Sequence, residues 1–177
     1  LIVVSLHTQE KKLGWCLNIF KKLFSLVVFY NKQLYVKCLV DTILLFNSYY
    51  GWSRWSIKKN KKPYKIQYLS TEHFLGILIV CTLIGMILGY LLTLYTSASM
   101  PYWDVTHATL IIATYTLLAR KKIQAWIIWI LANLIYLPVC WHKATYLFLL
   151  KYLLYTSMAC YGYYKWHKQV QKQLIEN

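Results

Sequence analysis

Apolar runs of helical length alternate with short polar or basic segments along almost the whole chain. A helix needs roughly 20 mainly apolar residues to cross a bilayer, and most of these runs come close to that length. The pattern predicts an all-α membrane protein with a seven-helix bundle. Its first helix ends near Thr8, and the others cover residues 13–30, 34–51, 73–96, 102–119, 125–140 and 144–164.

The apolar opening at Leu1 is too short to span a bilayer, and it lacks the basic region of a signal peptide. We therefore expect it to be the end of a first helix whose beginning lies outside this sequence.

Composition favours a membrane location over a soluble one. Hydrophobic residues make up 59% of the chain and charged residues only 14%, with a mean hydropathy of +0.40. A soluble domain carries about a quarter charged residues, so this chain could not surround one core with a wetted surface.

The net charge of +15 is concentrated at the ends of the apolar runs. Cytoplasmic loops of membrane proteins carry such an excess of Lys and Arg, whereas a nucleic-acid site would need a soluble face to display it. Placing the dense basic clusters on one side predicts a native N-terminus outside and a cytoplasmic C-terminus. These clusters lie at residues 10–12, 58–65, 120–122 and 165–172.

The order of features occurs twice along the chain. Tyr50-Gly51-Trp52-Ser53-Arg54-Trp55 returns as Tyr161-Gly162-Tyr163-Tyr164-Lys165-Trp166, and the same spacing aligns Trp15 with Trp126. An odd number of helices per repeat requires a linker helix if both repeats share one orientation. The predicted units are a first three-helix repeat (1–55), a basic cytoplasmic loop (56–72), a linker helix (73–99), a second repeat (100–166) and a basic tail (167–177).

The sixth predicted helix holds the densest group of candidate binding residues. Trp126, Trp129, Asn133 and Tyr136 fall on one helical stripe. An amide in the middle of a membrane span needs a protein, water or ligand partner, and an aromatic stripe could stack a flat heteroaromatic substrate. The alternative is a helix–helix interface with a satisfied asparagine and tryptophan anchors.

Asp41 lies within the third predicted helix, where carboxylates are costly and commonly functional. Lys37, one turn earlier, is a possible ion-pair partner. Asp104 begins the fifth helix, either as its cap or at the outer mouth of a pathway.

Tyr50, Trp52, Trp55, Tyr161 and Trp166 end two helices on the predicted inner side, where an aromatic belt explains them. Ser48 could supply a hydroxyl to a ligand.

No set of residues suggests catalysis, a cofactor or a metal. The five cysteines lack CxxC spacing, the five histidines form no HxxxH pattern, and no phosphate loop is present. We expect a protein that is not an enzyme.

Short motifs in this order resemble the PnuC family of bacterial nicotinamide riboside transporters. They are Tyr50-Gly51-Trp52 with Trp55, Tyr102-Trp103-Asp104, the basic segment 120–122 followed by Trp126 and Trp129, and Asn133 with Tyr136.

The resemblance implies a bundle related to the SWEET sugar transporters, with three-plus-one-plus-three helices, a homotrimer and a place in the bacterial inner membrane. It implies facilitated diffusion of nicotinamide riboside, trapped by a separate cytoplasmic kinase. It carries binding roles to Trp126, Trp129, Asn133 and Tyr136, and less directly to Tyr50, Trp52 and Trp55.

Two positions depart from the family pattern, because Asp41 stands where a Gln is expected and Ser48 where an Asn is expected. Another vitamin or nucleoside precursor (thiamine or riboflavin), a proton-coupled carrier and a truncated, non-transporting protein remain alternatives.

Overall fold

The computed structural model describes residues 1–56, 65–96 and 99–175. It contains seven helices: α1 (Ile2–Thr8), α2 (Leu13–Asn31), α3 (Tyr35–Ser56), α4 (Thr71–Tyr95), α5 (Pro101–Ala119), α6 (Gln124–His142) and α7 (Tyr146–Ile175). The predicted all-α bundle is confirmed, and no strand occurs among the described residues. The predicted basic loop at 58–65 lies almost wholly outside those residues.

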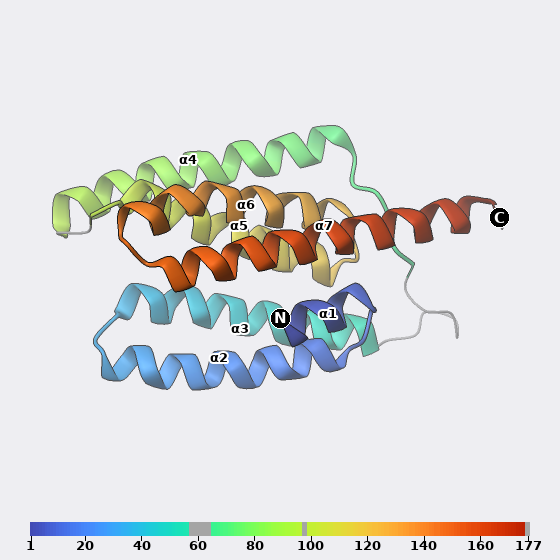
Figure 1. Cartoon of the computed structure of the whole chain (residues 1–177), viewed down its shortest axis with the longest axis horizontal. Helices are drawn as coiled ribbons and strands as arrows, with labels where there is room; N and C mark the ends of the chain where they lie inside the picture. The colour runs from blue at the N-terminus through green and yellow to red at the C-terminus, as the bar shows by residue number, and fades with distance from the viewer. Residues whose placement is uncertain (57–64, 97–98, 176–177) are drawn as a thin grey trace.

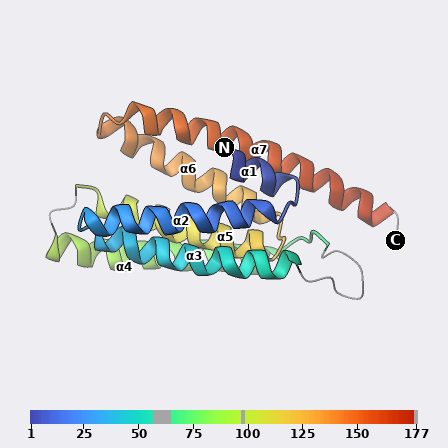
Figure 2. The same cartoon turned by 90° about the horizontal axis from the view of Figure 1, so that it is seen from below.

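Six of the helices form a ring, and the seventh lies outside it. Around the ring, α1 packs on α2, α2 on α3, α3 on α5, α5 on α6, α6 on α7, and α7 returns to α1. Helix α4 packs on α5 at the edge of the bundle (Figure 1). Figure 2 shows α1 beside α7, between that helix and α2.

The helix lengths and polarity fit the membrane prediction. Helices α2, α4 and α6 are long and apolar enough to cross a membrane. Helices α3, α5 and α7 are also long enough but contain more polar groups, several of which are buried toward other helices, including Asp41, Ser48 and Thr114. Many large apolar side chains of α2 and α4, such as Phe24 and Ile87, are exposed, as a lipid-facing surface requires.

Four short turns have the same structure. Glu10, Gln33, Lys121 and Ala144 adopt positive φ values of 55°, 56°, 48° and 51°. After each, a backbone N–H returns to the carbonyl five residues earlier at 2.9 Å, as in Lys11 to Leu6 and Lys122 to Leu117. These bonds close the helix ends as glycine usually does at this position.

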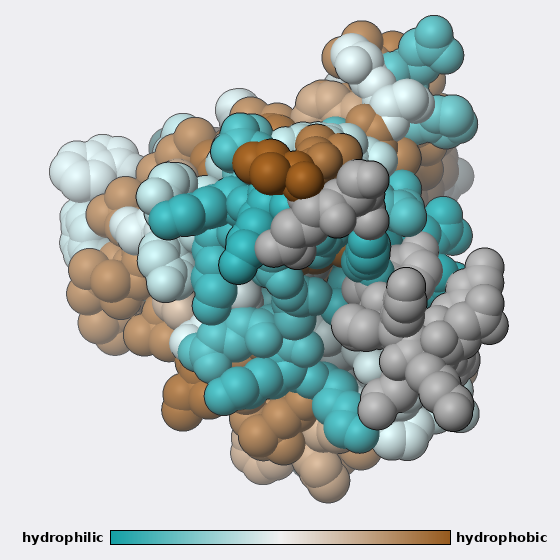
Figure 3. Space-filling view, turned by 90° about the vertical axis from the view of Figure 1, so that its right-hand side faces the viewer, coloured by the Kyte–Doolittle hydropathy of each residue, from teal (hydrophilic) through white to brown (hydrophobic). Residues whose placement is uncertain are grey.

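Helix α7 continues to Ile175, well beyond the predicted end at residue 164. The segment 165–175 contains no Gly or Pro to stop it. Hydrophilic surface gathers over this end of the bundle, with hydrophobic surface on the flanks (Figure 3).

Helix α4 approaches α5 through small residues. A Cβ on Gly85 would lie 2.1 Å from Thr106 Oγ1, and one on Gly89 would lie 2.6 Å from Tyr102. Thr109 Oγ1 also donates to the Cys81 carbonyl at 3.2 Å. The small side chains therefore let α4 dock on α5.

Candidate functional site

The predicted stripe on α6 faces the interior of the bundle. Trp126 and Trp129 are 0% and 4% exposed, and their rings stack with centroids 5.6 Å apart and an interplanar angle of 13°. Asn133, one turn further along, is fully buried. The structure thus brings these three predicted residues together.

Asn133 has no hydrogen-bond partner for either polar atom of its amide among the described residues. Burying an amide in this state costs about 1–3 kcal/mol. The alternative of an asparagine satisfied by a neighbouring helix is therefore not observed. An amide that can both donate and accept is available here to a ligand or an ordered water.

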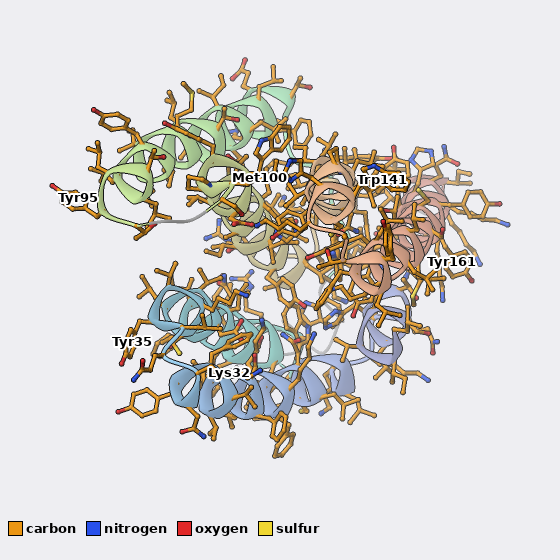
Figure 4. All side chains as sticks on the ribbon, turned by 60° about the vertical axis from the view of Figure 1, so that its left-hand side comes forward. Lys32, Tyr35, Tyr95, Met100, Trp141 and Tyr161 are labelled. Atoms are coloured by element: carbon orange, nitrogen blue, oxygen red, sulfur yellow. The ribbon has the colours of Figure 1, made fainter. Side chains whose placement is uncertain are left out.

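Tyr136 lies further along the stripe, nearer the α6–α7 turn. Its hydroxyl donates to Asp104 Oδ1 at 2.5 Å, and Asp104 Oδ2 pairs with Lys143 at 3.3 Å. Asp104 makes no side-chain cap for α5. It instead links α5 to α6 and to the following turn, at the end of the bundle marked by Met100 and Trp141 in Figure 4.

The Tyr136 ring belongs to an aromatic group between α5, α6 and α7. It lies 4.3 Å from the ring of His107 and 5.2 Å from that of Tyr152, centroid to centroid. The His107 Nε2 atom is buried without a partner among the described residues. Histidine and tyrosine side chains therefore pack together on the side of Asn133 that lies toward the α6–α7 turn.

Asp41 is bound by α2, not by its own helix. Its carboxylate accepts bonds of 2.5 Å from Lys22 Nζ and from Ser25 Oγ. The possible pairing with Lys37 is not observed among the described residues, and that ammonium instead lies 5.5 Å from the Phe29 ring centroid. Spacing along one helix could not reveal a partner on the neighbouring helix.

Ser48 is fully buried in a polar chain that reaches the second half of the molecule. Its hydroxyl accepts from Asn18 Nδ2 at 2.7 Å and donates to the Leu44 carbonyl at 2.6 Å. Tyr115 of α5 donates to Asn18 Oδ1 at 3.4 Å. The hydroxyl is thus satisfied by protein and connects α2 with α3.

Buried aromatic rings fill the opposite end of the ring of helices, beside the basic turns at residues 10–12 and 120–122. Trp15 and Trp55 meet edge to face at 5.4 Å, as do Trp126 and Trp166. The Trp55 and Trp166 rings then join the two pairs at 6.3 Å. We call this group, with His7 and Tyr115, the inner aromatic cluster.

An ion pair closes the same end. Lys121 Nζ lies 2.5 Å from Glu10 Oε2, and Gln169 of α7 donates to Glu10 Oε1 at 2.5 Å. The ammonium also lies 5.1 Å from the Trp55 ring centroid. The α1–α2 turn, the α5–α6 turn and α7 are therefore held together by polar contacts beside the inner aromatic cluster.

Tyr50 is only partly buried against the core, and Trp52 lies at the surface. The Tyr50 hydroxyl accepts from Arg54 Nη1 at 3.1 Å, and Trp52 is 36% exposed. Tyr161, the repeat partner of Tyr50, extends away from the bundle in Figure 4 and is 59% exposed. The belt interpretation fits these residues better than ligand contact, whereas Trp55 belongs to the inner aromatic cluster.

The internal repeat is visible in the packing. A Cβ on Gly51 would lie 2.6 Å from the Trp15 ring, and one on Gly162 would lie 2.7 Å from the Trp126 ring. The ion pair Glu10–Lys121 joins positions separated by 111 residues, which is the repeat spacing itself. The two repeats therefore meet at equivalent turns.

Sequence reasoning missed two partly buried polar residues, Lys22 and Ser25, that the repeat could have located. At the repeat spacing, Asn133, Tyr136 and Tyr152 correspond to Lys22, Ser25 and Asp41. In the first repeat, Lys22 and Ser25 both bond to Asp41. At the equivalent positions the second repeat has the unpaired Asn133 and two tyrosines. Alignment of the repeats before residue selection would have singled out Lys22 and Ser25.

A groove of about 780 Å³ lies elsewhere, between α3, α4 and α5. Its lining is mainly apolar, with Ile43, Val80 and Ile112 among its residues. It lies outside the ring of helices, so it suits hydrocarbon chains of lipid better than a polar substrate.

Comparisons with known proteins agree with the observed fold and place the chain among transporters. A family profile described as nicotinamide mononucleotide transporter matches residues 1–168. The chain is 22% identical over 192 residues to the nicotinamide riboside transporter PnuC of Escherichia coli (strain K12), covering 94% of this chain and 80% of that protein. The same values hold for PnuC of Shigella flexneri.

A solved structure has the same fold. The crystal structure of the vitamin B3 transporter PnuC matches with a TM-score of 0.72 and 17% identity, covering 96% of this chain and 77% of that one. At 17% identity, this match supports only a shared fold.

Proposed function

The chain belongs to the nicotinamide mononucleotide transporter family, and from this premise we propose that it carries nicotinamide riboside by facilitated diffusion. It is a membrane transporter and not an enzyme. The observation that carries the proposal is the buried, unpaired amide of Asn133 beside the stacked rings of Trp126 and Trp129. PnuC relatives with this substrate in their names support it.

The chemistry of the site suits a substrate with a carboxamide on an aromatic ring. An amide side chain can donate to the carboxamide oxygen and accept from its nitrogen. Indole rings bind flat cationic rings by stacking and by cation–π attraction. Trp126 is already packed against Gly162, so Trp129 is the ring better placed to meet the ligand.

Passage across the membrane would follow from movement of one repeat against the other. In this structure the inner end is closed by the inner aromatic cluster and by the pair Glu10–Lys121. Both groups join the two repeats, so both must separate when the inner end opens. These contacts support the proposal that the structure represents a state closed toward the side of the basic clusters.

The remaining parts of the proposal concern the cell. Those basic clusters would face the cytoplasm, with the C-terminus inside and the native N-terminus outside the bacterial inner membrane. A kinase that phosphorylates the riboside would maintain the inward gradient. Family resemblance also favours a homotrimer.

Uptake into proteoliposomes tests this function. Labelled nicotinamide riboside should equilibrate saturably without an ion gradient, and Asn133→Ala should lower the rate at least about tenfold, as expected for a lost pair of polar contacts. Leu134→Ala is the matched control, because Leu134 is the next residue on α6 and is 45% exposed. The proposal fails if folded, unmutated protein gives no saturable uptake or if both variants transport equally.

The alternative substrates are separated by competition. Unlabelled thiamine or riboflavin should leave the uptake of nicotinamide riboside unchanged. Displacement by either would assign the site to that vitamin. Uptake that collapses when a proton gradient is dissipated would instead indicate a proton-coupled carrier.

A further inference from the structure

His107 of α5 has a ring nitrogen that the proposed function has not yet used. Its Nε2 atom is buried and makes no hydrogen bond among the described residues. The imidazole ring lies 4.3 Å from the ring of Tyr136 on α6 and 5.5 Å from that of Tyr152 on α7, centroid to centroid. His107 therefore lies where α5, α6 and α7 meet, with a polar atom available to a ligand or an ordered water.

The unpaired amide of Asn133 lies close to this ring. Tyr136 is three residues after Asn133 on the same stripe of α6, and three residues advance a helix by roughly 4.5 Å. The His107 ring packs on that of Tyr136. The two residues whose buried polar atoms lack a partner are therefore separated by about one helical turn along α6.

The internal repeat supports the same grouping. In the first repeat, Lys22 and Ser25 of α2 both bond to Asp41 of α3 at 2.5 Å. At the repeat spacing, the equivalent residues of the second repeat are Asn133, Tyr136 and Tyr152. The rings of Tyr136 and Tyr152 lie 5.2 Å apart, so this helix pair also meets at the equivalent positions. The shared frame of the repeats therefore directs Asn133 and Tyr136 toward Tyr152 of α7.

The surroundings of His107 suit a neutral hydroxyl group. The Tyr136 hydroxyl donates to Asp104 Oδ1 at 2.5 Å. An anionic group of a ligand would meet this carboxylate, whereas a neutral hydroxyl would not be repelled by it. An imidazole nitrogen can donate to or accept from a hydroxyl, and the oxygen of Tyr136 can still accept one bond.

We propose that His107 binds the ribose of the substrate through Nε2, so that it distinguishes a nucleoside from its free base. The inference rests on the proposed function, which places the carboxamide at Asn133. In nicotinamide riboside the pyridine ring separates the carboxamide from the sugar. A ring that extends from Asn133 toward the α6–α7 turn therefore brings the ribose beside Tyr136 and His107.

Two ligands that differ only in the sugar test this role. 1-Methylnicotinamide has the same cationic ring and carboxamide as nicotinamide riboside, with a methyl group in place of the ribose. Binding of both is measured on purified protein in lipid nanodiscs. His107→Phe should weaken nicotinamide riboside about five- to tenfold, the effect of one lost hydrogen bond, and leave 1-methylnicotinamide unchanged. Asn133→Ala should weaken both ligands.

Further variants separate recognition of the sugar from a packing role. Phenylalanine keeps the ring contacts of His107, so His107→Phe should not lower the unfolding temperature. His107→Gln should restore most of the affinity for nicotinamide riboside, because its amide can bond to a hydroxyl although it has no ring. His73→Phe is the matched control, since His73 is exposed in the first turn of α4, outside the ring of helices.

The inference is overturned if His107→Phe weakens both ligands equally or neither of them. In that case, dependence of nicotinamide riboside on Asn133 would leave the proposed function standing. Uridine, which has the same ribose on another base, separates the opposite case. If uridine binds in a way that requires His107 and neither nicotinamide compound binds, the function fails and the sugar site is supported. If no riboside binds to folded, unmutated protein, both are rejected.

Discussion

The two three-helix repeats share a frame of tryptophan–glycine contacts and similar turns, but they differ in the polar residues of their interior. Trp15 packs on Gly51 as Trp126 packs on Gly162, and the turn residues Glu10 and Lys121 adopt the same left-handed backbone. Two to three turns from this frame, the first repeat holds Lys22 and Asp41 in an ion pair, whereas the second holds the unpaired Asn133.

The difference shows which positions geometry dictates. Where a tryptophan ring packs on a glycine, any residue larger than glycine would collide with the ring, so both repeats have glycine at this position. The polar positions are not fixed by such a contact, since Lys22 and Ser25 bond to Asp41 whereas Asn133 has no partner among the described residues. The proposed function accounts for this divergence, because one asymmetric substrate between two similar repeats would present different groups to each.

The largest effect should come from the pair that joins the repeats. Glu10→Lys would place two ammonium groups together beside Trp55 and should destabilise the protein by about 3 kcal/mol. The double variant Glu10→Lys/Lys121→Glu should recover most of that loss, because both positions have equivalent backbone conformations. Thermal unfolding in detergent measures both. If the exchanged pair is no more stable than the single variant, the two turns are not equivalent.

The polar interiors should respond in opposite directions to apolar substitution. Lys22→Met leaves the buried Asp41 carboxylate without its cation and should cost about 2–3 kcal/mol. Asn133→Leu removes an unpaired amide and should leave stability unchanged or raise it by about 1 kcal/mol, while transport is lost. Thermal unfolding and uptake should be compared for both variants. Equal destabilisation would mean that Asn133 has a structural partner.

The smallest effect concerns the shared frame. Gly51→Ala and Gly162→Ala should each cost about 1–2 kcal/mol, since the new methyl would press on Trp15 or Trp126. Gly76→Ala is the control, because nothing lies within 4 Å of its added Cβ. That change should be neutral or slightly stabilising, since alanine favours helix. If Gly51→Ala and Gly162→Ala lower the unfolding temperature by very different amounts, the tryptophan–glycine contacts of the two repeats are not equivalent.

Much of the fold follows from the sequence alone. Runs of apolar residues of bilayer length set the number of helices, and Ala119 was correctly predicted to end the fifth helix. The family followed from short aromatic motifs in a fixed order, and the family profile confirms it. The unit boundaries and the binding roles stay predictions, because neither the fold nor the relatives test them.

What the tertiary structure decided is the partner of each buried polar group. Asp41 has Lys37 one turn away in sequence but bonds to Lys22 and Ser25 across a helix interface. Glu10 reaches Lys121 only because the ring of helices brings two distant turns together. Periodicity reports which residues share a helix face, whereas the packing of one helix on another determines which faces meet. Local pattern therefore determined the helices and the family, and only packing distinguished the satisfied charge of Asp41 from the unsatisfied amide of Asn133.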